Sequence, residues 1–191
     1  MLRLRWLMAV FCWASFLSAA NTQAIAPAGV KTAGPYSPGI FAGEFLYVSG
    51  QGAQRPDGTI PDTLEGQIQQ CLKNVETIVR AAGLTMDHLV FTQVYLTNAA
   101  NEEELNRVWR EAFPKNPPAR STIGVARLPG TPVEVTAVAV KDLARKKRIA
   151  PPGYPESSPI SPGVLVGDRL YLSGFLGRDI HTGRIPDDAS E

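Results

Sequence analysis

The stretch that decides the fold is Pro118-Ala119-Arg120-Ser121-Thr122-Ile123-Gly124-Val125, followed after Leu128-Pro129-Gly130 by Val133-Glu134-Val135-Thr136-Ala137-Val138-Ala139-Val140. β-Branched residues dominate both runs and a Pro-Gly pair stands between them, so the pattern predicts two β-strands joined by a turn. Arg120 lies in the first strand and Glu134 in the second. Charged groups rarely occupy half-buried sheet positions without a partner or a ligand. The two residues therefore indicate either a ligand site or a structural salt bridge between them.

The chemistry of these two side chains favours a small anionic ligand. A guanidinium binds a carboxylate or phosphate through two parallel hydrogen bonds, and a carboxylate can position or polarise a water molecule. Alternation along a strand places Arg120 on one face with Thr122 and Gly124, and Glu134 on one face with Thr136. The register between the two strands does not follow from the sequence, so the distance between Arg120 and Glu134 stays open.

The preceding residues predict the remaining elements of one domain. Two short strands, at 36–40 and 45–49, are joined by a turn at Ala42-Gly43-Glu44. A helix begins near Asp62 and ends at Gly83, a strand covers 89–97, and a second helix runs from Asn101 to Pro114. The order strand, strand, helix, strand, helix, strand, strand predicts an α+β fold with both helices packed on one face of the sheet. The other face must meet solvent or another copy.

The N-terminus resembles an export signal. Arg3 and Arg5 precede an apolar run from Trp6 to Leu17, and Thr22-Gln23-Ala24 follows as an A-x-A-like cleavage site. The run is shorter than the roughly 20 residues that span a bilayer, so we expect no stable membrane span after cleavage. An uncleaved anchor is the alternative. We predict an exported protein, periplasmic or secreted, whose remaining Cys71 is a buried apolar residue on a helix stripe.

The C-terminal part of the chain repeats its beginning. Ser158-Pro159-Ile160-Ser161-Pro162-Gly163 echoes Gly34-Pro35-Tyr36-Ser37-Pro38-Gly39, and Leu170-Tyr171-Leu172-Ser173-Gly174 echoes Leu46-Tyr47-Val48-Ser49-Gly50, at an offset of about 124 residues. The chain between the copies is basic and then rich in proline, which is typical of a solvated linker.

These observations predict four segments: a signal peptide at 1–24, a complete domain at 25–140, a linker at 141–157 and an incomplete second copy at 158–191. The second copy contains neither helix and no counterpart of Arg120 or Glu134. It suggests a fragment, or a truncated form, of a tandem protein.

Three motifs in this order resemble the Rid/YjgF family of reactive intermediate deaminases, formerly labelled L-PSP endoribonucleases. They are Gly34-Pro35-Tyr36-Ser37-Pro38-Gly39, Leu46-Tyr47-Val48-Ser49-Gly50-Gln51 and the segment from Pro118 to Val135. The resemblance implies a chorismate-mutase-like mixed sheet and a homotrimer with clefts between subunits.

The resemblance also implies a reaction. Rid proteins hydrolyse small enamines, through imines such as 2-iminopropanoate or 2-iminobutanoate, to 2-keto acids and ammonia, without a metal or organic cofactor. It assigns Arg120 to the substrate carboxylate, Glu134 to the attacking water, and Tyr36, Ser49 and the Gly50 backbone to the wall of the same cleft. Thr122 stands where many members have cysteine, and Ile160 replaces the counterpart of Tyr36 in the second copy.

Other functions remain as alternatives. An exported binding protein would hold a small carboxylate-bearing molecule through Arg120 without turnover. The older label suggests a ribonuclease, but loss of Arg3 and Arg5 with the signal changes the formal net charge from +1 to about −1, so we predict no nucleic-acid partner. The only histidines are His88 and His181, and no His/Cys cluster has the spacing of metal ligands, so we assign no metal site.

Overall fold

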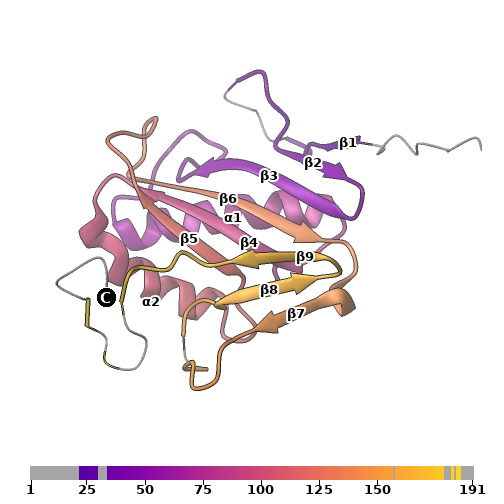
Figure 1. Ribbon diagram of the computed structural model, residues 1–191. Coiled ribbons are helices and arrows are strands. Elements are labelled where there is room, and N and C mark those ends of the chain that lie inside the picture. The colour runs from indigo at the N-terminus through magenta and orange to yellow at the C-terminus, as the bar shows by residue number, and fades with distance from the viewer. Residues whose placement is uncertain (1–21, 30–33, 157, 179–181, 183, 186–191) are drawn as a thin grey trace, which may run out of the picture.

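The computed structural model describes residues 22–29, 34–156, 158–178, 182 and 184–185. Most of the predicted signal peptide therefore lies outside the described residues. The main body is a six-stranded sheet in the order β1-β2-β3-β6-β4-β5 (Figure 1). Its strands are β1 (Thr22–Ile25), β2 (Gly39–Ala42), β3 (Phe45–Gly52), β4 (Leu89–Leu96), β5 (Ala119–Gly124) and β6 (Val133–Val140).

The two strands of the deciding stretch are present, but they are not neighbours. β4 lies between β5 and β6, and it pairs parallel with β5 and antiparallel with β6. Parallel neighbours need a crossover connection, and here it contains the helix α2 (Glu102–Ala112). The turn between β5 and β6 therefore spans a strand position instead of closing a hairpin.

Both predicted helices pack on one face of this sheet. The first, α1 (Leu64–Ala81), begins with Thr63 as its N-cap, one residue after the predicted Asp62, because the Thr63 hydroxyl accepts a hydrogen bond from Gly66 N at 3.1 Å. The predicted stop is confirmed, since Gly83 adopts the left-handed φ of 76° beyond the helix end. Short 3-10 turns lie at Met86–His88, Ala99–Asn101 and Leu143–Arg145. The prediction of an α+β fold with a mixed sheet and two helices is confirmed.

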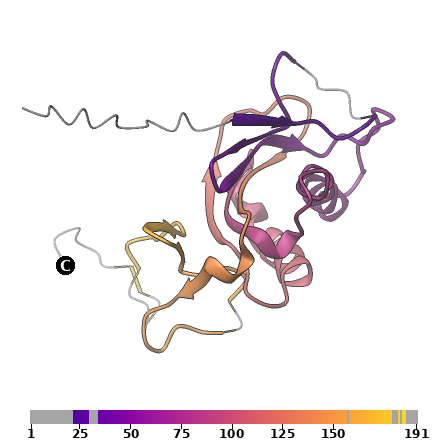
Figure 2. The ribbon, with the colours of Figure 1, turned by 90° about the vertical axis from the view of Figure 1, so that its right-hand side faces the viewer.

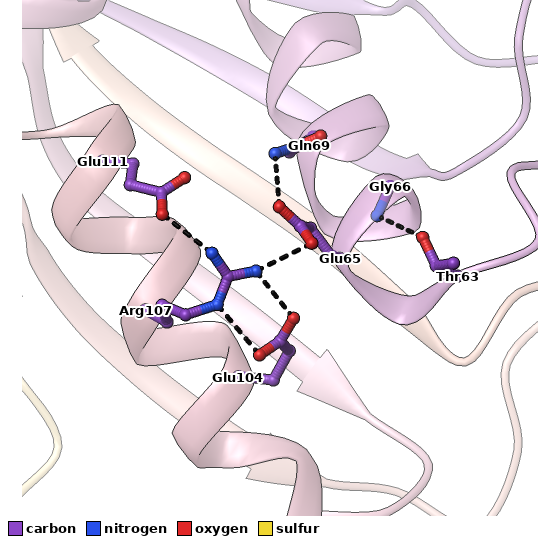
Figure 3. A network of polar contacts seen from close by, with 7 residues as sticks. All are labelled: Thr63, Glu65, Gly66, Gln69, Glu104, Arg107 and Glu111. Carbon is purple, nitrogen blue, oxygen red and sulfur yellow. Dashed lines mark hydrogen bonds and ion pairs between the residues drawn. The ribbon is translucent and has the colours of Figure 1, made fainter.

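An ion-pair network joins the two helices on their outer side (Figure 3). Arg107 of α2 contacts Glu65 of α1 at 2.9 Å, and Glu104 and Glu111 of its own helix at 2.8 Å each. All four side chains are partly exposed, so each pair contributes modestly to stability. The Arg107–Glu65 pair adds a polar contact between the two helices.

The core between the helices and the sheet contains Cys71, as predicted. Its side chain is fully buried and its thiol donates to Val133 O at 3.6 Å. Burial raises the pKa of the Cys71 thiol to about 12, and the charge of Glu134 adds to the rise. A thiol in this state is not a nucleophile near neutral pH.

A second, three-stranded sheet covers part of the face that the helices leave open. It consists of β7 (Lys146–Ile149), β8 (Gly163–Val166) and β9 (Arg169–Leu172), in that order. Figure 2 shows it on the side of the main sheet away from both helices. Its contact with the main sheet is an apolar cluster of buried residues: Phe45, Val90, Ala119, Val140, Val164 and Val166.

The predicted linker differs from the structure at residues 146–149, which form strand β7. The basic side chain of Lys146 is not simply solvated, because its Nζ donates to Asp87 O at 2.9 Å and to Asn116 O at 3.0 Å. These two carbonyls anchor the start of the second sheet to the loops of the main body.

The second sheet has the register of the first three strands, 124 positions later. Gly39 pairs with Val48 and Ile25 with Gly39, while Gly163 pairs with Leu172 and Ile149 with Gly163. The turns match as well, since Gly43 has a φ of 60° and Gly167 a φ of 62°. We call β1, β2 and β3 with their connections the β1–β3 unit, and β7, β8 and β9 with theirs the β7–β9 unit.

Among the described residues, no helix has the length and apolar character needed to cross a membrane.

Candidate functional site

Four of the five predicted site residues line one open pocket of about 1050 Å³. They are Tyr36, Ser49, Gly50 and Glu134, which come from the loop before β2, from β3 and from β6. The Tyr36 side chain is 47% exposed, so its ring is available to a ligand. The structure therefore brings the two N-terminal motifs and Glu134 together, as the resemblance implies.

A bulge in β3 forms the wall of this pocket. The pairing of β3 with β6 shifts register between Val48 and Gln51, so Ser49 and Gly50 lie outside the regular ladder. Ser49 binds back to the first motif, because its hydroxyl donates to Ser37 O at 2.6 Å and its N–H donates to Pro38 O at 2.9 Å. These bonds hold the two motifs as one corner.

Gly50 leaves room for the Glu134 carboxylate in its observed position. A Cβ at Gly50 would lie 2.7 Å from the Glu134 Cδ and closer still to its Oε1. The carboxylate thus occupies the space of a side chain at Gly50 and faces the pocket beside the bulge. This close approach explains a glycine within a strand.

Arg120 lies apart from this pocket. Its guanidinium sits 5.1 Å from the centre of the Trp109 ring, and its Nη2 donates to Asn106 Oδ1; both partners belong to α2. The side chain is buried, with 3% exposure, and its Nε and Nη1 have no hydrogen-bond partner among the described residues. Burial lowers the pKa of Arg120 to about 10, while the charge of Glu102 opposes this shift.

Arg120 and Glu134 point to opposite faces of the sheet. Arg120 pairs with Thr92 and lies under α2, while Glu134 pairs with Tyr95 and alternates with residues buried under the helices. Two strand spacings and three residues along β4 put their Cα atoms roughly 14 Å apart. The alternative of an Arg120–Glu134 salt bridge is excluded, and the two residues of one main sheet cannot form a shared site alone.

The β7–β9 unit binds the edge of β5 at Arg120, which the sequence patterns did not reveal. Arg120 N donates to Ser173 Oγ at 2.9 Å, and Gly174 N donates to Arg120 O at 3.0 Å. Ser161 N donates to Pro118 O at 3.2 Å. The echo of Ser49-Gly50 in Ser173-Gly174 was visible in the sequence, but its binding partner was not.

The described residues contain no group of three or more His, Cys, Asp or Glu side chains arranged to hold a metal ion. His88 lies at a helix start, where its Nδ1 accepts from Thr85 N at 3.2 Å.

Comparison with known proteins shows the family of this chain. The family model described as endoribonuclease L-PSP matches residues 26–141. A RutC family protein of Saccharolobus solfataricus is 36% identical over 114 residues, which are 58% of this chain and 90% of that protein.

Solved structures agree with this match. The E. coli YjgF gene product is 32% identical with a TM-score of 0.59, and the match covers 63% of this chain and 99% of that chain. The structure of E. coli TdcF with bound serine gives 32% identity, a TM-score of 0.60 and the same coverage. The chain therefore belongs to the endoribonuclease L-PSP family, which is the Rid/YjgF family that its motifs resemble.

Proposed function

We propose that the protein hydrolyses small imines that carry a carboxylate, of the 2-iminopropanoate or 2-iminobutanoate type, to 2-keto acids and ammonia. The observation that carries the proposal is the buried Arg120 guanidinium with two donors left free. Buried donors without a partner are costly, and an anionic ligand would satisfy them. The serine bound to E. coli TdcF is a small molecule with such a carboxylate, which supports this ligand class.

The reaction needs few groups. Water adds to the electrophilic imine carbon, the resulting carbinolamine loses ammonia, and the C=N bond is replaced by C=O. Glu134 would orient the water and accept its proton, which then passes to the leaving nitrogen. Holding the carboxylate on Arg120 would keep the imine carbon near that water, and positioning of this kind lowers a barrier by several kcal/mol, roughly 7 to 11 in favourable cases.

The two parts of the site, Arg120 and the pocket around Glu134, would come from different copies of the chain. Arg120 and Glu134 lie on opposite faces of their own sheet. A substrate held by one Arg120 therefore needs the Tyr36, Ser49 and Glu134 pocket of another copy of the chain. The homotrimer expected from the family resemblance, with its clefts between subunits, provides such a meeting. We propose it as the active assembly.

The experiment is a coupled assay in which 2-iminopropanoate is generated in situ and its disappearance is followed. Saturable acceleration that is lost in Arg120→Ala and in Glu134→Gln supports catalysis. Binding of pyruvate that depends on Arg120, without any acceleration of hydrolysis, supports the exported binding protein instead.

We also propose that residues 1–24 direct export. Cleavage after Ala24 would remove Thr22, Gln23 and Ala24, which pair with Ala42, Phe41 and Ile40 of β2. The mass of the protein recovered from the cell envelope or medium tests this, since a mature chain beginning at Ile25 supports cleavage and an intact N-terminus contradicts it.

A further inference from the structure

The β1–β3 unit and the β7–β9 unit contain the same hydrogen-bonded corner. Ser49 Oγ donates to Ser37 O at 2.6 Å, and Ser173 Oγ donates to Ser161 O at 2.6 Å. The Ser49 N–H donates to Pro38 O at 2.9 Å, and the Ser173 N–H donates to Pro162 O at the same distance. Together with the matching strand registers, this makes the two units structural copies of each other.

The β7–β9 unit uses its corner to bind the main body. Ser173 accepts from Arg120 N, Gly174 donates to Arg120 O, and the Ser161 hydroxyl donates to Pro117 O at 2.6 Å. Val164 and Val166 add an apolar contact and are 0% and 1% exposed. We call the receiving surface, the edge from Pro117 to Arg120 with the apolar residues beside it, the β5 edge.

The β1–β3 unit presents the same surface with little contact among the described residues, where the Tyr47 hydroxyl accepts one hydrogen bond, from Arg169 Nη1 at 3.1 Å. Ile40 occupies the position of Val164 and is 39% exposed, where Val164 is fully buried. Ser37 and Ser49 are partly exposed, whereas Ser161 and Ser173 are buried at 0% and 6%. Ser49 Oγ accepts no hydrogen bond from the described residues, although its counterpart Ser173 Oγ accepts one from Arg120 N. One copy of the surface is thus buried and the other is largely exposed, with Ile40 39% and Tyr47 40% exposed.

We propose that the β7–β9 unit covers the β5 edge in competition with the β1–β3 unit of a second copy of this chain. With the cover in place, each chain lacks a free β5 edge and a head-to-tail ring of copies cannot close. When the β7–β9 unit leaves, the exposed edge receives the β1–β3 unit of the next copy. The catalytic consequence rests on the proposed function, because this exchange brings the Tyr36 and Glu134 pocket of one copy to Arg120 of another.

The covering unit resembles a partner but differs from it at the position of Tyr36. Ile160 stands in the position of Tyr36 and packs against the main core. The described part of the unit therefore does not repeat the Tyr36 ring at the β5 edge. Because the cover keeps Arg120 from the Tyr36 and Glu134 pocket of a second copy, it would be an autoinhibitory contact.

A set of matched substitutions tests the competition in the full chain. Val164→Asp places a carboxylate in the apolar contact and should release the β7–β9 unit, while Ile40→Asp makes the same change 124 positions earlier on the free copy. Sedimentation velocity should give the mass of one chain for wild type and for Ile40→Asp. It should give an assembly of several copies for Val164→Asp. The variant with both Val164→Asp and Ile40→Asp should again have the mass of one chain, because the β1–β3 unit can no longer bind the released β5 edge.

Two results would overturn the proposal. One is a single-chain mass for Val164→Asp at all concentrations while hydrogen exchange shows that the Arg120 amide has lost its protection. The other is an assembly of wild type that Ile40→Asp dissociates, since this would show that the β5 edge is free without release of the β7–β9 unit. Ser161→Asp, compared with Ser37→Asp, repeats the test by breaking hydrogen bonds instead of apolar packing.

The mass and the activity separate this proposal from the proposed function. Assembly of Val164→Asp with a several-fold gain in imine hydrolysis over wild type supports both. Assembly without any hydrolysis supports the competition and contradicts the enzyme. Full hydrolysis by a single-chain wild type contradicts the autoinhibitory cover and the two-copy site, but not imine hydrolysis itself. Circular dichroism of each variant checks that the main body, which matches 99% of each of two solved E. coli chains, stays folded.

Discussion

Arg120 and Glu134 lie on the two sides of strand β4 and on opposite faces of the sheet, although they are only fourteen positions apart in the chain. The parallel pairing of β5 with β4 causes this separation, because it places β4 between the two residues. A reaction in which both side chains act on one substrate molecule must therefore use Arg120 of one copy of the chain and Glu134 of another.

Gly50→Ala should reduce hydrolysis by displacing Glu134. The new Cβ would meet the carboxylate group, 2.7 Å from its Cδ, so the carboxylate must turn away from the pocket. General base catalysis contributes about 10²- to 10⁴-fold to a rate, and we expect a loss in kcat within that range. Steady-state kinetics with 2-iminopropanoate measures it.

Gly174→Ala is the matched control for this change, 124 positions later. Its Cβ would lie 3.4 Å from Ser121 Oγ, which is an ordinary contact, so the fold should tolerate it. Equal kcat in wild type and Gly50→Ala would show that Glu134 does not act from its observed position.

Arg120→Met should abolish carboxylate recognition without lowering stability. Methionine keeps much of the apolar packing on Trp109 and removes the buried Nε and Nη1 donors that lack a partner. Each such donor costs roughly 1–3 kcal/mol, which offsets the lost contact with Asn106. Urea denaturation should give a free energy of unfolding no lower than that of wild type.

Asn106→Ala provides the opposite comparison. It leaves a third guanidinium donor without its partner and should lower the free energy of unfolding by about 1–2 kcal/mol. Strong destabilisation by Arg120→Met together with a neutral Asn106→Ala would mean that the guanidinium serves the fold and not a ligand.

Lys146 should make stability depend on pH in the alkaline range. Burial lowers its pKa from 10.5 in the unfolded chain to about 8 in the folded protein. Between these values the unfolded chain binds the proton and the folded protein does not, so the free energy of unfolding should rise as the pH increases from 8 to 10.5. Below pH 8 the charged, partly buried group contributes its full destabilisation.

Urea denaturation of wild type and Lys146→Met at about pH 7, 8.5 and 10 measures this effect. The free energy of unfolding of wild type should increase relative to that of the variant across the series. Parallel pH profiles for the two proteins would show that the ammonium is not held in a desolvated position.

The sequence predicted the elements of the main body because their patterns are local. The apolar spacing of α1, the stop at Gly83 and the alternation in β4 each depend on neighbouring residues, and each is present. The gathering of Tyr36, Ser49 and Glu134 was inferred from family motifs and agrees with the pocket.

These local patterns do not predict which distant strands pair. Nothing local shows that β4 inserts between β5 and β6, so the separation of Arg120 from Glu134 could not be read from the residues. The short strand β7 was missed because its lysines and arginine resemble a solvated linker, and only two distant carbonyls show that Lys146 is anchored.

Mixing two inactive variants tests most directly whether the site is shared between two copies of the chain. Arg120→Ala and Glu134→Gln are refolded together, with and without Val164→Asp in both chains, and assayed with 2-iminopropanoate. In a mixed ring some clefts receive Arg120 from one variant and Glu134 from the other, so a 1:1 mixture should recover roughly a quarter of the activity of the matched parent. No recovery in mixtures that demonstrably co-assemble, or full activity of either variant alone, would contradict a site shared between copies.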